Sequence, residues 1–479
     1  MSPNGQVRAR PSLVNVNATP PPYEDTPYME VVQWSATKGC YHASPPRTLR
    51  PALSARIPHE VIEFIINGMD TPTLAAAALV CAIWYSPVMR NLYFTVELHD
   101  RTSFDLLFKQ SRTSPRVRHW LATTRELVAS DPHPSLLNAI EAGDLSLGQE
   151  RKTARFLHSL PLAFGRTMCS VRALSVSDLH RFTRPEFFRY LAQFKSLKAL
   201  ALSRCTLSAS QLRRIICAVP QLEALTLEGD ILADEGPFDS PPVHWHLLPP
   251  TRTRLRRLGI HLDASDGVSL SRHRAIVDCL VRSGFCASLN DIAVRGTDHP
   301  SWNTTLIDEL LKAAGPALTR YSEDGFPHGR HGNLARNAAL RSLDFSLLGP
   351  VVAGAGQSIH SWSKVSDDLR SVLVMARSHQ LEHIVIRIDL PLHLNATQEM
   401  RDALNQRSNL MLRDLHNLMY RPDFATLKGV EVSVRLLYAS RDGKEAEVES
   451  IKGSVGKAIR LLLRPWHGRG VLHLSWRNS

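Results

Sequence analysis

The sequence predicts an α/β protein in which a short helical module precedes a solenoid, that is, a curved parallel sheet with helices on its convex side. Two observations predict this fold. Residues 57–98 carry apolar side chains at helical spacing, punctuated by prolines. A leucine-spaced motif then recurs after 26 and 25 residues in the middle of the chain, with helical patterns between its copies. Strands that alternate with helices are typical of α/β folds with a parallel sheet.

The composition is that of a large chain with more than one part. Its 479 residues are 43% hydrophobic, which is enough for a sizeable core and normally for more than one domain. The N-terminal residues hold PPPY and few periodic apolar residues, which predicts a disordered lead. We therefore expect three parts: the lead at 1–52, a helical module at 53–98 and the solenoid at 99–479.

The chain is basic, with a net charge of +12 and an isoelectric point near 9.6. Such a charge makes acidic partners plausible, including nucleic acid, acidic protein faces and anionic membrane surfaces. The basic residues are spread out, however, and form no run of about five or six with interleaved aromatic residues. We therefore assign the excess to the solvated surface rather than to a nucleic-acid footprint.

The longest apolar run, LAAAALVCAIW at 74–84, is too short to span a bilayer, which takes about 20 apolar residues. The N-terminal residues lack the apolar core of a secretory signal. The seven cysteines contain no C-x-x-C pair, which fits neither a disulfide framework nor a zinc knuckle. We expect a soluble protein of the cytoplasm or nucleus with reduced thiols.

Three short helices are predicted in the module. RIPHEVIEFIINGM places four apolar residues at helical spacing, and Pro58 suits a first helical turn. Asp70 or Thr71 can cap the second helix, which contains LAAAALVCAIW. A third helix is expected to start at Ser86-Pro87. Three helices of this length cannot bury their own apolar surface, so something else must cover the remainder.

The opening and closing motifs of the module resemble the F-box. The pattern I-P-x-E-V-I begins at Ile57, and L-V-C-x-x-W begins at Leu79. The usual F-box opens with L-P-x-E-(I/L) and closes with L-V-C-(R/K)-x-W. The chain departs from this pattern at Ile57, which replaces the usual leucine, and at Ala82, where a basic residue is common.

The resemblance implies docking onto the Skp adaptor of a cullin-type ubiquitin ligase. Carried over by position, the adaptor-binding residues are Ile57, Pro58, Ile62, Leu79, Val80 and Trp84. The Ala-rich face is then expected to pack internally, while Leu79, Val80 and Trp84 meet the partner. The alternative is that these residues only pack the three helices onto the downstream domain.

The middle of the chain resembles a leucine-rich repeat. LKALALSRCTL at 197–207 fits the consensus L-x-x-L-x-L-x-x-N/C-x-L, and related copies start at 171 and 222. Weaker copies at wider spacing begin at Leu255, Leu289, Leu318, Leu340, Leu381 and Leu427. Segments 208–220 and 303–318 carry helical stripes between the copies, so stacked pairs of strand and helix would share one core.

The repeat also predicts where a target would bind. In L-x-x-L-x-L the last two leucines point inward, so the residues that flank and separate them face the concave surface. In the regular half these residues are small and neutral, and in the later half they carry more charge. The candidate target-binding residues are Thr226, Glu228, His261, Arg295, Asp344 and Arg387. We hypothesise that Arg295 and Arg387 attract a partner with an acidic patch; scattered surface charge is the alternative.

Catalytic and metal-binding motifs are not evident. Gly354-x-Gly356 lacks the third glycine and the helix of a dinucleotide site, and Gly456-Lys457 lacks the remainder of a P-loop. His328 and His331 stand without cysteine or acidic ligands nearby in the sequence. We therefore expect no enzyme activity, no cofactor and no metal.

These expectations combine into a substrate-recognition adaptor. Its F-box-like module would dock on the Skp adaptor of a cullin ligase, and its leucine-rich repeats would hold a target protein near the ligase. The first alternative is a leucine-rich interaction scaffold whose helices only cap the solenoid, with no ligase link. The second is a nucleic-acid-binding protein driven by the positive charge. No membrane partner is expected, and the sequence does not name the target.

Overall fold

The structure is a computed structural model. It describes residues 57–130, 156–179, 185–205, 207–229, 253–262, 269–296, 304–325, 331–349, 362–392, 412–438 and 445–478. The lead expected at 1–52 and the glycines at 354 and 356 lie outside these residues. The chain divides into two compact units, which we describe separately: unit 1 covers 1–95 and unit 2 covers 96–479. No helix among the described residues has both the length and the apolarity needed to cross a membrane.

Unit 1 contains three short helices, α2 (His59–Asn67), α3 (Thr71–Ala77) and α4 (Ala82–Leu92). Pro58 is the N-cap of α2, and its carbonyl accepts from the backbone N–H groups of Val61 and Ile62. Asp70 caps α3 as predicted, because its Oδ1 accepts from the backbone N–H of Thr73 at 3.0 Å.

The predicted boundaries of the second and third helices are wrong. LAAAALVCAIW does not form one helix: α3 ends at Ala77, a tight turn follows, and α4 starts at Ala82 with Cys81 as its extended N-cap. In the turn, the N–H groups of Leu79 and Val80 donate to carbonyls three residues earlier. Pro87 does not begin a helix but lies inside α4. Helix propensity alone predicts one helix through this run. In the folded module the three helices pack together, and the chain turns between Ala77 and Ala82.

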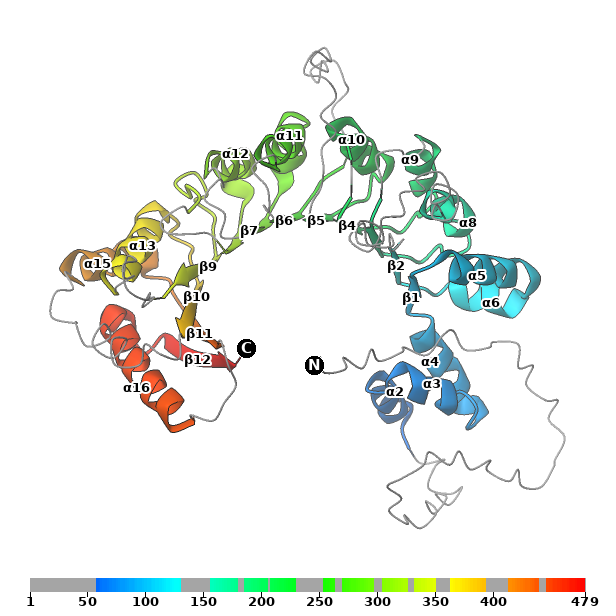
Figure 1. Ribbon diagram of the computed structural model, residues 1–479, viewed down its shortest axis with the longest axis horizontal. Helices are drawn as coiled ribbons and strands as arrows, with labels where there is room; N and C mark the ends of the chain where they lie inside the picture. Colours follow the sequence, from blue (N-terminus) through cyan, green and yellow to red (C-terminus); the bar gives the residue numbers. More distant parts are fainter. Residues whose placement is uncertain are drawn as a thin grey trace, which may run out of the picture. The chain divides into compact units, whose positions relative to one another are not determined.

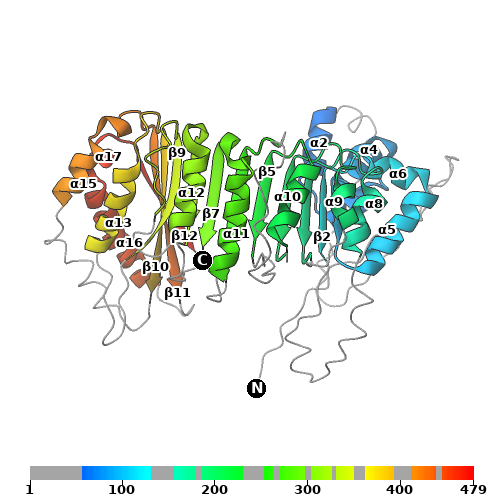
Figure 2. The same cartoon turned by 90° about the horizontal axis from the view of Figure 1, so that it is seen from above.

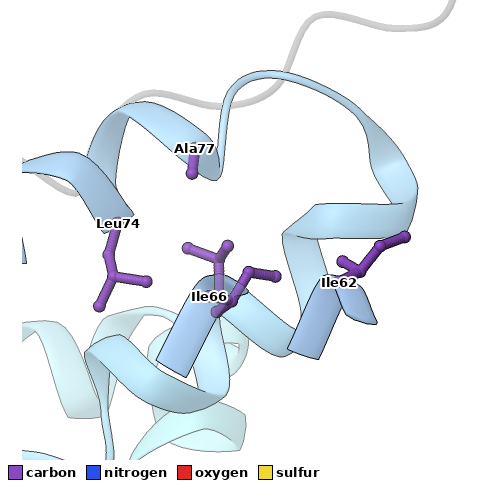
Figure 3. Packing of buried hydrophobic residues seen from close by; sticks show 5 residues of the cluster. Ile62, Ile66, Leu74 and Ala77 are labelled. Carbon is purple, nitrogen blue, oxygen red and sulfur yellow. The ribbon is translucent and has the colours of Figure 1, made fainter. Parts of the chain in front are cut away.

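The core of unit 1 is small and apolar. Five buried residues pack together (Figure 3), and partly buried residues such as Ile57 and Trp84 pack against them. The five are Ile62, Ile66, Leu74, Ala77 and Val88.

Unit 2 is built on a parallel sheet whose strands follow chain order. The sheet has twelve strands, from β1 to β12, and each is hydrogen-bonded to its neighbours in the sequence. The strands are β1 (Thr95–Leu98), β2 (Glu126–Ser130), β3 (Ala173–Ser177), β4 (Ala199–Ser203), β5 (Ala224–Glu228), β6 (Arg257–Leu262), β7 (Asp291–Gly296), β8 (Arg320–Asp324), β9 (Ser342–Leu348), β10 (His383–Leu392), β11 (Gly429–Tyr438) and β12 (Leu472–Asn478). Parallel neighbours require crossover connections. Helices of the described residues lie in most of these connections, as α10 (Ala209–Ala218) does between β4 and β5.

The helices of unit 2 cover one face of this sheet. In Figure 1 the strands β4 to β12 line the inner side of an arc and the helices its outer side, and Figure 2 shows the strands side by side behind α10, α11 and α12. The helices are α5 (Arg101–Thr113), α6 (Pro115–Leu121), α8 (Leu160–Phe164), α9 (Pro185–Leu191), α10 (Ala209–Ala218), α11 (Ser269–Arg282), α12 (Thr304–Ala314), α13 (Trp362–Met375), α15 (Leu412–Met419), α16 (Glu445–Leu462) and α17 (Arg464–Gly468). The predicted α/β fold with a parallel sheet and helices is confirmed.

The leucine spacing explains how each strand joins the core. In β4, Leu200 and Leu202 are buried while Ala201 and Ser203 are half-exposed on the other side. Helix α10 follows directly, started by a capping box in which Ser208 and Gln211 satisfy each other's backbone N–H groups. Its apolar stripe is buried as predicted, at Leu212, Ile215, Ile216 and Val219. Strand and helix together therefore enclose the core between them.

Candidate functional site

Unit 1 leaves an unusual amount of apolar surface exposed. Leu79, Phe64, Val80 and Ile83 are 83%, 80%, 67% and 60% exposed. Apart from Phe94, which follows α4, six exposed residues make up what we call the apolar surface of unit 1: Val61, Phe64, Ile65, Leu79, Val80 and Ile83. Burying one such side chain stabilises a complex by about 1.5–3 kcal/mol, so a partner that covers several of them gains considerably. Large exposed apolar sets on small domains mark interaction sites.

Three segments present this apolar surface: helix α2, the turn between α3 and α4, and the start of α4, which carries Ile83. On α2, Ile62 and Ile66 face the core, which leaves Val61, Phe64 and Ile65 on the outer side of the helix. The turn between α3 and α4, closed by backbone hydrogen bonds from Leu79 and Val80, presents both of these side chains to solvent.

The six residues assigned to adaptor binding from the resemblance fall into two groups. Leu79 and Val80 are exposed, and Pro58 is exposed at the start of α2. Ile62 is buried in the core of the module, and Ile57 and Trp84 are partly buried against that core.

Four residues of the apolar surface were not predicted: Val61, Phe64, Ile65 and Ile83. Helical periodicity marks Val61 and Ile65 as core residues together with Ile62 and Ile66. The sequence held one signal of their exposure: α2 carries more apolar residues than the single buried face of a two-turn helix can hold.

The six candidate target-binding residues lie on one face of the sheet of unit 2. Strand register places them in two neighbouring rows. One row runs from Thr226 on β5 through Gly259, Ala293 and Ser322 to Asp344 on β9. Strands are about 4.8 Å apart, so four strand spacings separate Thr226 from Asp344 by about 19 Å.

The second row carries the charged candidates. Glu228, His261 and Arg295 are register partners on β5, β6 and β7, and Asp324 on β8 follows. Arg387 lies further along on β10, beside Ser346 on β9. The sequence pattern therefore gathers all six on one surface, although they lie far apart in the chain.

The regular half of this face is hollowed. A cavity of about 250 Å³ lies over strands β2 to β5. Its lining residues are mostly small, and include Val128, Ser175, Ala201 and Thr226 from one register row. Small side chains leave the backbone of the sheet accessible here, so a ligand side chain could enter.

The charged half of the face is internally paired. Arg387 is 20% exposed; its guanidinium lies 3.0 Å from Asp344 and 3.4 Å from Asp324. It also donates to the carbonyl of Glu323 at 3.1 Å. Arg295 contacts Asp324 at 3.4 Å. Burial raises the pKa of Asp344, and Arg387 beside it offsets part of that rise. The two arginines of the acidic-patch hypothesis are therefore already engaged by carboxylates.

His331, one of the two histidines considered for metal binding, has a different role. It is buried and its Nδ1 pairs with Glu323, whose other oxygen accepts from the hydroxyl of Tyr321 at 2.8 Å. Burial raises the pKa of Tyr321 well above its ordinary value, with Glu323 adding to the effect. His328 lies outside the described residues. Among the residues that the structure describes, no group of three His, Cys, Asp or Glu side chains could hold a metal ion.

The thiols in the core are unreactive. Burial raises the pKa of Cys205 and Cys286 to about 12 and that of Cys279 to about 11. A thiol with such a pKa carries almost no thiolate at neutral pH, and the thiolate is the nucleophile. These cysteines therefore serve as small apolar core residues.

No protein-family model and no curated protein sequence matches this chain.

Proposed function

We propose that the protein is a substrate-recognition adaptor: the apolar surface of unit 1 docks on the Skp adaptor of a cullin-type ubiquitin ligase, and the sheet face of unit 2 captures a target protein. Binding to both at once raises the effective concentration of the target near the ligase, without chemistry by this chain.

One observation carries the proposal. Leu79 and Val80, from the motif that resembles the closing element of the F-box, are more than two-thirds exposed in the turn between α3 and α4. An apolar pair held outward in a tight turn costs solvation free energy in the isolated chain, and a partner that covers it removes that cost. The order of the motifs and the three-helix arrangement support the same assignment.

The sheet face of unit 2 supports the capture step. It combines the cavity over β2 to β5 with the charged rows on β6 to β10, so it offers both apolar and polar contacts to a protein partner. Interfaces of stable complexes bury about 800 Å² on each partner, and a face that spans many strands can supply this area.

Co-purification with a Skp-type adaptor tests the proposal. The full chain and the adaptor are co-expressed, and the tagged chain is captured. We expect wild type to retain the adaptor and Leu79→Asp and Val80→Asp to lose it, because each places a charge in the apolar contact. The matched control is Leu162→Asp on α8, which changes a residue that is 55% exposed in unit 2 and should retain the adaptor.

Two results contradict the proposal. If wild type fails to retain the adaptor, the protein is a scaffold without a ligase link. If both charged variants retain it as wild type does, the docking residues are wrong. Circular dichroism of each variant shows whether the fold is intact.

A further inference from the structure

One edge of the sheet in unit 2 carries a continuous ladder of polar residues, most of them charged. These residues immediately precede the strands, and the backbone N–H of each donates to the carbonyl of the one before it at 2.7–2.9 Å. We call this row the amino-edge ladder; it comprises Arg125, Arg172, Lys198, Glu223, Arg256, Asn290, Thr319, Arg341, Glu382 and Lys428. Parallel pairing in regular register therefore aligns side chains from segments far apart in the chain.

The two carboxylates of the ladder are engaged by its two lysines. Lys198 pairs with Glu223 at 2.8 Å, and Lys428 pairs with Glu382 at 3.0 Å. The remaining cations of the ladder are arginines, and none of them forms an ion pair with any described residue. Three of these, Arg172, Arg256 and Arg341, are exposed, and Arg125 is half-buried.

The next row of the sheet adds two more exposed arginines. Arg257 and Arg320 are register partners of Asp291, one on each side. Both arginines interact electrostatically with Asp291. Neither of them comes within ion-pair distance of a carboxylate of the described residues. Burial raises the pKa of Asp291 in spite of both arginines.

Four of these arginines lie at the amino ends of strands β6 to β9, in two adjacent register rows, and we call them the arginine edge: Arg256, Arg257, Arg320 and Arg341. Three strand spacings of about 4.8 Å separate β6 from β9, so the group spans about 14 Å. An extended peptide covers that distance with about four or five residues. The Debye length in physiological salt is about 8 Å, so the charges act together within two pairs, Arg256 with Arg257 and Arg320 with Arg341 just before the neighbouring strand.

We propose that the arginine edge binds an acidic segment of the captured protein, a stretch of Asp or Glu residues that crosses the amino ends of strands β6 to β9. The inference rests on the proposed function, because it assigns the chemistry of the target that unit 2 holds. Guanidinium groups suit this role, since each presents a planar fork of donors that matches a carboxylate.

The same edge fits an acidic peptide better than nucleic acid. Glu223, Asp291 and Glu382 stand among the arginines and would repel a continuous phosphate backbone. None of the positions in the amino-edge ladder is aromatic, whereas single-stranded nucleic acid is held by stacking on aromatic side chains. A peptide can place its carboxylates opposite the arginines only.

The inference places the acidic partner at the arginine edge instead of at Arg295 and Arg387. Arg295 and Arg387 already contact Asp324 and Asp344, so an incoming carboxylate would have to compete with those residues. No carboxylate of the described residues lies within ion-pair distance of the arginine edge, although Glu223, Asp291, Asp344 and Glu382 interact with its arginines at longer range.

Fluorescence anisotropy on the full chain tests the proposal. The ligand is a labelled peptide of about twelve alternating Glu and Ser residues, long enough to cross the edge with room to spare. We expect it to bind, and to bind more weakly as the salt concentration rises from about 50 to about 200 mM. A peptide with Gln in place of Glu should not bind. The variant Arg256→Gln/Arg257→Gln/Arg320→Gln/Arg341→Gln should weaken binding about tenfold or more, which corresponds to about 1.4 kcal/mol.

The matched control removes the same charge elsewhere. Arg189, Arg214, Arg336 and Arg370 are exposed on α9, on α10, before β9 and on α13, and their joint replacement by Gln should leave the affinity within about twofold. Equal weakening in both variants means diffuse attraction by the net charge and overturns the proposal. Absent binding of the Glu peptide overturns it as well. Tighter binding of a labelled duplex than of the peptide, lost in the arginine-edge variant, assigns the edge to nucleic acid instead.

Adaptor retention is measured on the same preparation. If the adaptor is retained and the Glu peptide does not bind, the acidic-segment inference fails alone. If the peptide binds and the adaptor is not retained, the ligase link fails and the arginine edge remains a peptide-binding site.

Discussion

Arg387 on β10 lies 3.0 Å from Asp344 on the neighbouring strand β9, and the same guanidinium reaches Asp324 on β8 at 3.4 Å. One arginine thus ties three adjacent strands together across the concave face. Its partners lie 43 and 63 positions earlier in the chain, as the residue numbers show, so only the folded sheet brings these charges together.

Arg387→Ala should lower the free energy of unfolding by about 1–3 kcal/mol, because it leaves the partly buried Asp344 without its paired cation and Asp324 with Arg295 alone. The variant should also lose stability more steeply as the pH rises from 3.8. Burial raises the pKa of Asp344, so the native state keeps the proton to a higher pH than the unfolded state does. Stability therefore falls as the pH rises from the ordinary pKa of the carboxyl group to its raised pKa in the native state. Urea unfolding at several pH values measures both effects. Adding Asp344→Asn should remove the extra slope, and a slope that persists contradicts this assignment.

Tyr321→Phe should destabilise unit 2 by about 1–3 kcal/mol, because Glu323 loses the hydroxyl that donates to it at 2.8 Å in a buried site. Thermal unfolding measures the change. Tyr420→Phe is the control, since Tyr420 is 69% exposed and its loss of a hydroxyl should change stability by less than about 0.5 kcal/mol. Equal effects of the two variants would mean that the buried hydroxyl contributes nothing specific.

Gly325→Ala should destabilise by more than about 1 kcal/mol. Gly325 directly follows β8 with φ of +77°, and a Cβ atom there would collide with the carbonyl oxygen of Gly296. Gly453→Ala in α16 is the opposite case: its Cβ would meet nothing within 4 Å, and alanine favours helix, so a gain of up to about 1 kcal/mol is expected. Chemical denaturation measures the change in the free energy of unfolding for both variants. A Gly325→Ala protein as stable as wild type contradicts the steric argument.

Ile66→Ala and Phe64→Ala separate folding from docking in unit 1. Ile66 is buried in the module core, so its truncation should cost about 2–5 kcal/mol. Phe64 lies two residues away and is exposed on the other side of α2, so Phe64→Ala should leave the melting of unit 1 nearly unchanged and weaken adaptor retention. Hydrogen exchange of α2 reports the first effect and co-purification the second. Loss of exchange protection in Phe64→Ala would show that Phe64 supports the fold rather than the contact.

The sheet of unit 2 was predictable because one pattern recurs along the chain, at regular spacing from 171 to 222 and at wider spacing after that. In L-x-L the two leucines must point to the same side of a strand, as Leu200 and Leu202 do in β4. The helix stripes at 208–220 and 303–318 follow the same reasoning, and both segments contain a helix, α10 and α12. Local periodicity therefore fixes which face of each element is buried.

The side chains that act together could be predicted only in part. The turn at Leu79 and Val80 escaped prediction because an Ala-rich run has helix propensity throughout. Pairing of Arg387 with Asp324 depends on strand register across long connections, which sequence spacing does not specify. The arginine edge is hidden for the same reason, since Arg256 and Arg341 become neighbours only through the ladder of parallel strands.

The central claim is that the exposed apolar residues of unit 1 dock on a Skp-type adaptor, and the dissociation constant of that complex tests it most directly. Isothermal titration of the purified full chain with the adaptor gives this constant for wild type, Leu79→Asp, Val80→Asp and the control Leu162→Asp. The account predicts measurable binding by wild type and Leu162→Asp, weakened about a hundredfold or more by either charge at the turn, which is about 2.8 kcal/mol. Equal constants for all four proteins, or no binding by wild type, would contradict it.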